Sequence, residues 1–272
     1  MHTELVAIPV TVTDARGHHV SGLSQENFRV YDDGRLQPIA VFHHGDEPVT
    51  LGLIVDRSQS MRPKSAALLA AVSALLQSSR PDDELFAVGF NDRVSFALPA
   101  SRPYTSDTRE LEAALTAVHA EGQTALYDGV AEGLQHLQLN HTAKHALIVV
   151  SDGGDNASHR TYAEVLALAR RSNAVIYAIG LLGTSPAEEE EDAGLLKRLC
   201  KDTGGVAYFP TTADEIARVA GRIALDLREQ YTIGFSPAES AASRRFHQIR
   251  VTANGGDRGK LRVRARTGYL AR

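Results

Sequence analysis

Three oxygen-bearing side chains follow one apolar segment of the chain at alternate positions. Asp56, Ser58 and Ser60 come directly after the run 51–55, which has the continuous apolar character of a strand buried on both faces. An extended loop would point all three side chains to one side, because successive side chains alternate in such a loop. A carboxylate beside two hydroxyls can hold a hard cation, but Asp and Ser before a helix are also favoured N-caps. Taken alone, the motif leaves both interpretations open.

Two further oxygen donors occur at comparable positions later in the sequence. Thr124 lies in the loop 122–129, which leads into a predicted helix, and Asp152 follows the apolar run 145–150. The carboxyl ends of parallel strands meet at one edge of a sheet, where α/β proteins bind their ligands. We therefore predict a metal site with five ligands, namely Asp56, Ser58, Ser60, Thr124 and Asp152.

The chemistry of this donor set selects the ion. Carboxylate and hydroxyl oxygens without a soft donor suit a divalent cation, Mg²⁺ first and Mn²⁺ or Ca²⁺ as alternatives, rather than zinc. The two carboxylates of Asp56 and Asp152 would leave the bound ion with a net positive charge and an open position. A carboxylate from outside the chain could fill that position.

The segment that carries these residues alternates between strands and helices. Apolar runs predict strands at 51–55, 85–90, 94–98, 145–150, 174–182 and 206–209. Helical patterns cover about 63–79, 107–119, 126–138, 162–172, 187–202 and 214–229. This alternation predicts an α/β domain with a mostly parallel central sheet flanked by helices.

Both ends of the chain are predicted to form strands. Near the N-terminus, 28–31 and 39–42 are expected to pair as a hairpin around Asp32-Asp33-Gly34. Alternating patterns recur at 231–235, 246–253 and 261–265. We expect one small antiparallel β layer built from both ends, because chain termini often lie close together. The predicted division is an N-terminal β segment (1–47), the α/β domain (48–230) and a C-terminal β segment (231–272) that packs with the N-terminal one.

The composition is globular and limits the function classes. The 272 residues carry 29 Lys and Arg against 33 Asp and Glu, a formal net charge of −4, which argues against a strongly basic nucleic-acid binder. The single cysteine, Cys200, excludes an internal disulfide and is expected to be a small buried hydrophobe. No apolar stretch approaches the roughly 20 residues of a transmembrane helix. The first residues lack the features of a signal peptide.

Charge is distributed unevenly along the chain. From Arg244 onward there are nine Lys and Arg and one Asp. Arg262, Arg264 and Arg266 alternate and would share one strand face, which we interpret as exposed to solvent because no aromatic residues interleave with them. The acidic run 188–192 is interpreted as the first turn of a helix. The paired histidines at 18–19 and 43–44 are interpreted as surface residues.

At the predicted site the sequence resembles a known family. The segments 56–61, 122–128 and 151–153 are similar to the metal-ion-dependent adhesion site (MIDAS) of von Willebrand factor type A (VWFA) domains, and the likeness extends over roughly 48–230. The flanks 10–34 and 230–269 resemble a bacterial subgroup, the VWFA-related proteins described from acidobacteria. The resemblance implies a Rossmann-like domain whose five ligands hold the ion directly or through water. It also implies a partner protein that donates an exposed Asp or Glu side chain to the ion.

Four neighbours of the predicted ligands are candidates for supporting them or contacting the partner: Arg57, Gln123, Asp155 and Asn156. Arg57 replaces a small residue or Thr, and Gln123 replaces a Gly, that are commoner in the family. We expect the Arg57 side chain to point away from the metal and to help hold an acidic partner. Asp155 and Asn156 would orient Asp152 or bound water, with an ordinary Asx-rich turn as the alternative.

These features predict a non-catalytic, divalent-metal-dependent module for adhesion or protein interaction. A metal-dependent hydrolase of phosphate esters is the alternative, although Ser58 stands where a phosphotransferase would need a second carboxylate. A purely structural, metal-stabilised scaffold is the third reading. Family resemblance implies a secreted, periplasmic or cell-surface protein, with the cytoplasm as the alternative because the chain shows no signal peptide. The sequence indicates no nucleic-acid partner, and it does not determine the oligomeric state.

Overall fold

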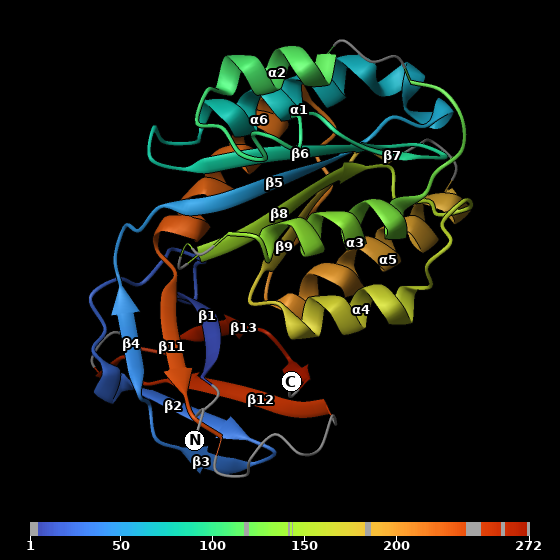
Figure 1. Ribbon diagram of the computed structural model, residues 1–272. Coiled ribbons are helices and arrows are strands. Elements are labelled where there is room, and N and C mark those ends of the chain that lie inside the picture. Colours follow the sequence, from blue (N-terminus) through green and yellow to red (C-terminus); the bar gives the residue numbers. More distant parts are fainter. Residues whose placement is uncertain are drawn as a thin grey trace.

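The computed structural model has a large central sheet covered by helices and, at one end of it, a smaller all-β part (Figure 1). It describes residues 5–116, 120–140, 142, 144–182, 186–237, 246–256 and 259–270, and the backbone alone for 186–192. The central strands are β5 (Val49–Asp56), β6 (Glu84–Phe90), β7 (Val94–Phe96), β8 (Lys144–Ser151), β9 (Val175–Gly180) and β10 (Ala207–Tyr208). Their spatial order is β10-β9-β8-β5-β6-β7, and only β7 pairs antiparallel.

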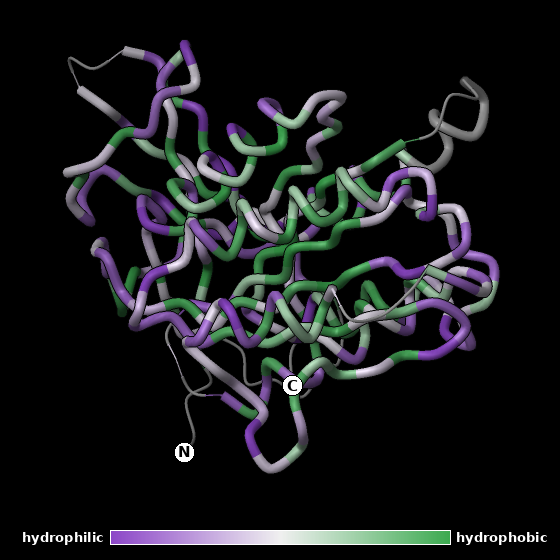
Figure 2. The backbone as a smooth tube through the Cα atoms, turned by 90° about the horizontal axis from the view of Figure 1, so that it is seen from above, coloured by the Kyte–Doolittle hydropathy of each residue, from purple (hydrophilic) through white to green (hydrophobic). Residues whose placement is uncertain are grey.

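Helices cover both faces of this sheet, as the sequence predicts. They are α1 (Ser65–Gln77), α2 (Thr108–Thr116), α3 (Leu126–Leu137), α4 (Tyr162–Arg171), α5 (Pro186–Thr203) and α6 (Ala213–Arg228). Leu51, Leu53 and Val55 of β5 pack toward α1, α2 and α6, whereas Ile54 packs toward the side of α3, α4 and α5 (Figure 1). Every residue of β5 is buried, because both faces are covered. Seen from above, hydrophobic segments run through the middle of the molecule and hydrophilic segments lie mostly toward its periphery (Figure 2).

The ends of two predicted helices differ from the structure or lie outside it. The segment expected as one helix from about 63 begins instead with a short 3₁₀ helix, η2 (Gln59–Lys64), which contains Pro63. Residues 117–119, the expected end of α2, and the side chains of the acidic run 188–192 lie outside the described residues. Within the described part of the chain, no helix combines the length and apolarity that a bilayer crossing requires.

The carboxyl edge of the central sheet lies away from the all-β part. β5 starts just after the all-β part and runs from it toward the opposite end (Figure 1). Its neighbours β6 and β8 are both parallel to it. The chain leaves β5 for β6 on one side, whereas it leaves β8 for β9 on the other, so the strand order reverses between β5 and β8. Such a reversal opens a crevice at the carboxyl ends of the two strands.

The two ends of the chain form two antiparallel sheets rather than the single layer expected. One has the order β13-β1-β11-β4, and the other has β14-β12-β2-β3. The strands are β1 (Val6–Thr13), β2 (Phe28–Asp32), β3 (Arg35–Gln37), β4 (Val41–His44), β11 (Tyr231–Phe235), β12 (Phe246–Ala253), β13 (Arg262–Ala265) and β14 (Gly268–Leu270). Apolar side chains from both sheets, among them Ile8, Phe28 and Phe235, form one shared core. The alternating patterns predict where the strands lie in the sequence, but they do not predict which strands share a sheet.

The hairpin at Asp32-Asp33-Gly34 has a different second strand from the one predicted. β2 turns back at once into β3, and residues Asp32 and Arg35 face each other across the turn. The expected return segment 39–42 contributes instead to β4, which pairs with β11 in the other sheet. A close turn between β2 and β3 requires Asp33 at φ 47° and Gly34 at φ 80°.

Buried charges join the all-β part to the helices. Asp226 of α6 is 2% exposed and pairs with both His19 and Arg264. Arg264 also donates to the Gly204 carbonyl at 2.8 Å, and Arg266 donates to the Ser172 carbonyl at 2.8 Å. Both carbonyls lie just beyond helix C-termini, where acceptors lack helical partners and favour cations.

The predicted exposed arginine stripe is therefore wrong for two of its three members. Arg266 is buried and Arg264 is partly buried against the helix ends, so only Arg262 is exposed. The surface interpretation of the histidines fails at His19, whose side chain is 9% exposed, although His18 and His43 are exposed. Cys200 is buried, as predicted, and burial raises the pKa of its thiol.

We predict that the Asp226 pairs lose their stabilising effect in acid. Burial by itself would raise the pKa of Asp226, but contacts with His19 and Arg264 outweigh it and hold the pKa below the ordinary value of 3.8. A carboxyl with a lowered folded pKa stabilises the protein above its unfolded pKa, and the effect disappears as the pH falls through the folded pKa. The difference in urea midpoint between the parent and Asp226→Asn should shrink below about pH 4. A difference that stays constant down to pH 2 would contradict this assignment.

Candidate functional site

The carboxylate of Asp56 lies at the end of β5 and is fully buried. The Ser151 hydroxyl donates to its Oδ2 at 2.5 Å, and the Ser58 backbone N–H donates to its Oδ1 at 2.9 Å. Burial raises the pKa of Asp56 to about 6 against the opposing effect of these hydrogen bonds, and the nearby charge of Asp152 adds to the rise. The hydrogen bonds to Asp56 therefore do not offset the cost of burying its charge.

The serines of the motif lie together, as the alternation predicts. The hydroxyls of Ser58 and Ser60 are 3.0 Å apart. Ser58 is buried beside Asp56, whereas Ser60 is exposed at the start of η2. The three side chains thus lead from the interior of the sheet edge to solvent.

Asp152 lies at the end of the neighbouring strand and pairs with a residue that the sequence analysis did not select. Lys64 Nζ is 2.9 Å from Asp152 Oδ2. The two side chains are 19% and 11% exposed, so the pair is mostly shielded from water. Lys64 lies 88 positions before Asp152, and no local pattern in the sequence relates the two. The structure therefore supplies one cation to the second predicted carboxylate ligand.

Backbone hydrogen bonds hold the Thr124 loop against the other two loops. The Gln59 N–H donates to the Gly122 carbonyl at 3.0 Å, which joins the Thr124 loop to the Asp56 loop. Asn156 Oδ1 accepts from the Thr124 N–H at 2.9 Å, and the Asn156 N–H donates to the Thr124 carbonyl at 2.9 Å. These bonds bring the segments that carry all five predicted ligands to one edge of the sheet.

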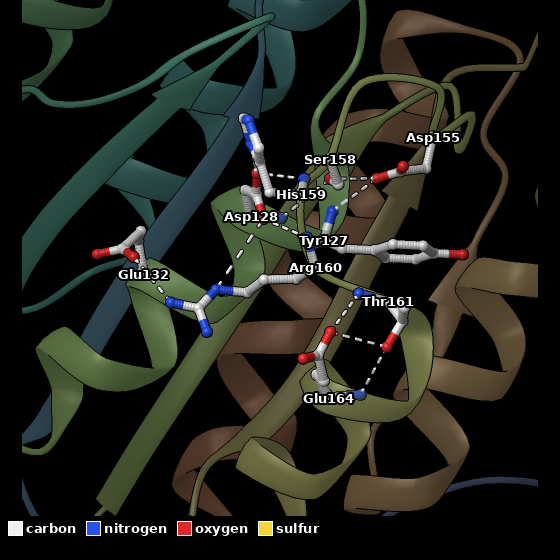
Figure 3. A network of polar contacts seen from close by, with 9 residues as sticks. All are labelled: Tyr127, Asp128, Glu132, Asp155, Ser158, His159, Arg160, Thr161 and Glu164. Atoms are coloured by element: carbon white, nitrogen blue, oxygen red, sulfur yellow. Dashed lines mark hydrogen bonds and ion pairs between the residues drawn. The ribbon is translucent and has the colours of Figure 1, made fainter.

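A further polar network fixes the loop that follows β8 (Figure 3). Asp155 Oδ2 accepts from the Tyr127 N–H at 2.8 Å and from the Ser158 hydroxyl at 2.6 Å. Asp128 accepts from the backbone N–H groups of His159 and Arg160 at 2.9 and 3.0 Å. Burial would raise the pKa of Asp128, but these hydrogen bonds lower it below its ordinary value. Asp155 and Asn156 thus connect the loop after β8 to the Thr124 loop and the start of α3 by hydrogen bonds.

Arg57 is buried against the neighbouring strand β6. Its side chain is 7% exposed and lies over Gly89 of β6, where a Cβ would be 2.5 Å from the guanidinium carbon. Its Nε and Nη2 atoms are buried without a hydrogen-bond partner among the described residues. Burial lowers the pKa of Arg57. In this conformation the guanidinium is not exposed to a partner, contrary to the contact expected for it.

Gln123 lies on the exposed rim of the same edge. Its backbone N–H donates to the Asp92 carboxylate, and its side chain is exposed. The preceding Gly122 has φ 76°, and a Cβ there would lie 2.6 Å from the Asp92 carboxylate. The tight approach of Asp92 therefore requires glycine at 122, and it leaves the Gln123 side chain free to face solvent.

Comparison with known proteins identifies the type of the α/β domain. Residues 51–154 match the sequence profile of the von Willebrand factor type A domain. The chain contains a von Willebrand factor type A domain. The matched residues run from β5 to the loop after β8, and so include all three loops that form the site. No sequence among the curated proteins matches the chain.

Solved structures share the fold of this domain at low sequence identity. A von Willebrand factor type A protein from Catenulispora acidiphila is 13% identical, with a TM-score of 0.56 over 90% of this chain and 73% of that one. BatB from Bacteroides thetaiotaomicron is 15% identical, with a TM-score of 0.52 over 66% of this chain and 98% of that one. The pilus adhesin SpaC from Lactobacillus rhamnosus GG is 12% identical, with a TM-score of 0.53 over 94% of this chain and 49% of that one.

The donor chemistry of this von Willebrand factor type A domain fits a hard divalent cation. Its carboxylates and hydroxyls are oxygen donors, and among the described residues no Lys, Arg or His forms an ion pair with the buried Asp56. Lys64 pairs with Asp152 and so compensates the charge of one of the two carboxylates. A divalent ion between the two carboxylates would compensate both, and the exposed Ser60 marks the side from which it would enter.

We predict that Lys64 weakens binding of a divalent cation to this domain. Its ammonium and the ion compete for Asp152, and two cations at one partly buried site repel each other. Lys64→Gln should therefore strengthen Mg²⁺ binding by about five- to tenfold, roughly 1 kcal/mol. Arg62→Gln, on the same 3₁₀ helix but bonded to the Ala120 carbonyl, serves as the matched control. Calorimetric titration of both variants would contradict the prediction if Lys64→Gln bound Mg²⁺ more weakly than the parent.

Proposed function

We propose that this domain binds a divalent cation, Mg²⁺ in the first instance, and through it an acidic side chain of a partner protein. The observation that carries the proposal is the buried Asp56 carboxylate, which faces hydroxyl groups and the Asp152 loop at the reversal point of the sheet. A carboxylate in such a place is costly to bury unless a cation compensates it. The ligands are Asp56, Ser58, Ser60, Thr124 and Asp152.

Each ligand has a separate part in this proposal. Asp56, oriented by Ser151, supplies the interior negative charge, and the hydroxyls of Ser58 and Ser60 extend the donor set toward solvent. Thr124 and Asp152 complete it from the neighbouring loops, whose positions Asn156 and Asp155 fix. A cation bound here would offer a Lewis-acidic position to a partner's Asp or Glu. The chain supplies oxygen ligands with only two negative charges. The bound ion would therefore keep a position that attracts a carboxylate.

We propose binding without catalysis. Ser58 occupies the position in which a phosphotransferase would carry its second carboxylate, and its hydroxyl is paired with that of Ser60 rather than with a base. The similar structure SpaC is described as a pilus adhesin, which supports an adhesive role and an extracellular or cell-surface location. The likeness of fold alone does not assign the function, so the site must be tested directly.

The test uses matched peptides as stand-ins for a partner. Immobilised peptides that present Asp or Glu, and their Asn or Gln counterparts, are titrated with the chain in Mg²⁺ and in chelator. We expect binding to the acidic peptides alone, lost in chelator and in Asp56→Ala. Acidic-peptide binding that persists in chelator would overturn the proposal. Mg²⁺ binding with no preference for acidic peptides would favour a structural scaffold, and metal-dependent turnover of chromogenic phosphate esters would favour the hydrolase.

A further inference from the structure

Three side chains of metal-ligating types meet in the all-β part, away from the carboxyl edge of the central sheet. Asp32 and Asp33 lie at the turn between β2 and β3, and His247 lies on β12, which pairs with β2. Within the described residues, these three offer ligand atoms that all lie within 4.8 Å of one another. Figure 1 shows β2, β3 and β12 below the central sheet, away from the end of β5.

Two of the three distances between ligand atoms are close to those around a bound ion. His247 Nδ1 lies 3.2 Å from Asp32 Oδ1 and 3.4 Å from Asp33 Oδ2. Zinc–nitrogen and zinc–oxygen bonds of about 2.0–2.2 Å at tetrahedral angles separate neighbouring ligand atoms by roughly 3.3–3.6 Å. The contact with Asp32 Oδ1 is a hydrogen bond, and one proton on Nδ1 cannot point at both carboxylates. The same nitrogen therefore faces two carboxylate oxygens, at spacings close to those between neighbouring ligands of one ion.

Neighbouring groups hold the three side chains in place. The Tyr269 hydroxyl donates to Asp32 Oδ2 at 3.2 Å, and its ring stacks on that of His247 with centroids 5.0 Å apart. The Gln248 N–H donates to Asp33 Oδ1 at 2.9 Å, which turns Oδ2 toward the imidazole. Metal ligands are commonly oriented by such second contacts.

The cluster is closed on one side and open on the other. The Asp32 and His247 side chains are 9% and 10% exposed, whereas that of Asp33 is 37% exposed. An ion could therefore enter beside Asp33 and keep water as a fourth ligand. Two carboxylates and a neutral imidazole balance the charge of a divalent cation. The nitrogen donor favours a borderline transition metal over Mg²⁺ or Ca²⁺, which prefer oxygen.

We propose that Asp32, Asp33 and His247 form a second metal site, which binds Zn²⁺ or a similar borderline divalent ion and fastens the β2–β3 turn to β12. This site does not depend on the proposed function of the Asp56 edge. The two sites also differ in the metal they select, since one offers oxygen alone and the other adds nitrogen.

The experiment is performed in the Asp56→Ala background with excess Mg²⁺, so that the outcome at the carboxyl edge cannot affect it. Zn²⁺ is titrated by calorimetry, and Co²⁺ by its visible absorption, into that variant and into versions with Asp33→Asn or His247→Gln added. Asp33→Asn is the milder change, because Asn tolerates the left-handed backbone at φ 47° and keeps an acceptor for Gln248. Asp14→Asn is the matched control, since Asp14 faces His18 Nδ1 at the same 3.2 Å without a third ligand.

We expect one Zn²⁺ to bind, with affinity reduced at least tenfold by Asp33→Asn and by His247→Gln but unchanged by Asp14→Asn. A Co²⁺ band that disappears in His247→Gln would identify the nitrogen ligand. Absence of Zn²⁺ binding in the Asp56→Ala background would overturn the proposal. Equal binding by Asp33→Asn and the Asp14→Asn control would do the same, because the ions would then be held by other surface histidines.

Discussion

Replacing Asp56 by alanine is expected to abolish saturable Mg²⁺ binding while the chain still folds. Asp56 is the only predicted ligand whose charged group is fully buried, and Ser58 and Ser151 are both oriented toward it. Loss of groups that merely support a metal ligand costs 10- to 100-fold in affinity, so loss of this carboxylate should cost at least about 100-fold, or about 3 kcal/mol. Calorimetric titration of chelator-treated protein measures the effect.

Two controls separate loss of the site from loss of the fold. Asp56→Asn keeps the shape of the side chain and removes its charge, so it too should lose Mg²⁺ binding. Without metal, burial makes the Asp56 charge unfavourable, so we expect the melting temperature of Asp56→Asn in chelator to equal or exceed that of the parent. Undiminished Mg²⁺ affinity in either folded variant would refute the ligand assignment.

Replacing Arg264 by alanine is expected to destabilise the protein by about 3 kcal/mol. The change removes the guanidinium from the buried Asp226, leaves the His19 contact in place, and removes the hydrogen bond to the Gly204 carbonyl. Breaking a buried ion pair costs more than the pair itself contributes, because one charge stays buried without compensation. Urea unfolding followed by circular dichroism measures the difference.

The neighbouring strand position provides the control for this second prediction. Arg262→Ala removes an exposed side chain from the same strand and should change the free energy of unfolding by less than about 0.5 kcal/mol. If Arg264→Ala were as mild as Arg262→Ala, the ion pairs with Asp226 would not hold the all-β part against the helices. The double variant with Asp226→Asn should recover part of the loss, because the unpaired charge is then gone.

The α/β domain could be predicted because its signals are local. The run 51–55 is apolar at every position because β5 is covered on both faces, and it ends at the residue where the chain turns into the site. Asp56 and Asp152 lie at the carboxyl ends of neighbouring parallel strands. Ligands of α/β proteins bind at that edge, so the two residues could be predicted to lie together without knowledge of the loop conformations.

The remaining features depend on partners that are distant in the sequence. Lys64 reaches Asp152 over 88 positions, and Arg264 reaches Asp226 over 38, with no pattern that marks either pair beforehand. The segment 39–42 has the composition of a hairpin strand, but its residues 41 and 42 pair with β11 in the other sheet. No sequence pattern selects His247, because Asp32 and Asp33 are also typical of a turn. Aspartate is common both in turns and among metal ligands, so its presence at a turn does not distinguish the two roles.

The central claim is that a divalent cation binds between the loops at the carboxyl edge of the central sheet. Crystals of the metal-free chain soaked in Mn²⁺, with data collected for anomalous scattering, test it most directly. The account predicts a peak within bonding distance of the Ser58 and Ser60 hydroxyls, bounded by Asp56, Thr124 and Asp152. It also predicts that this peak is absent in Asp56→Ala. An anomalous map with no peak at this edge, at saturating Mn²⁺ and with a carboxylate such as acetate present, would contradict the claim.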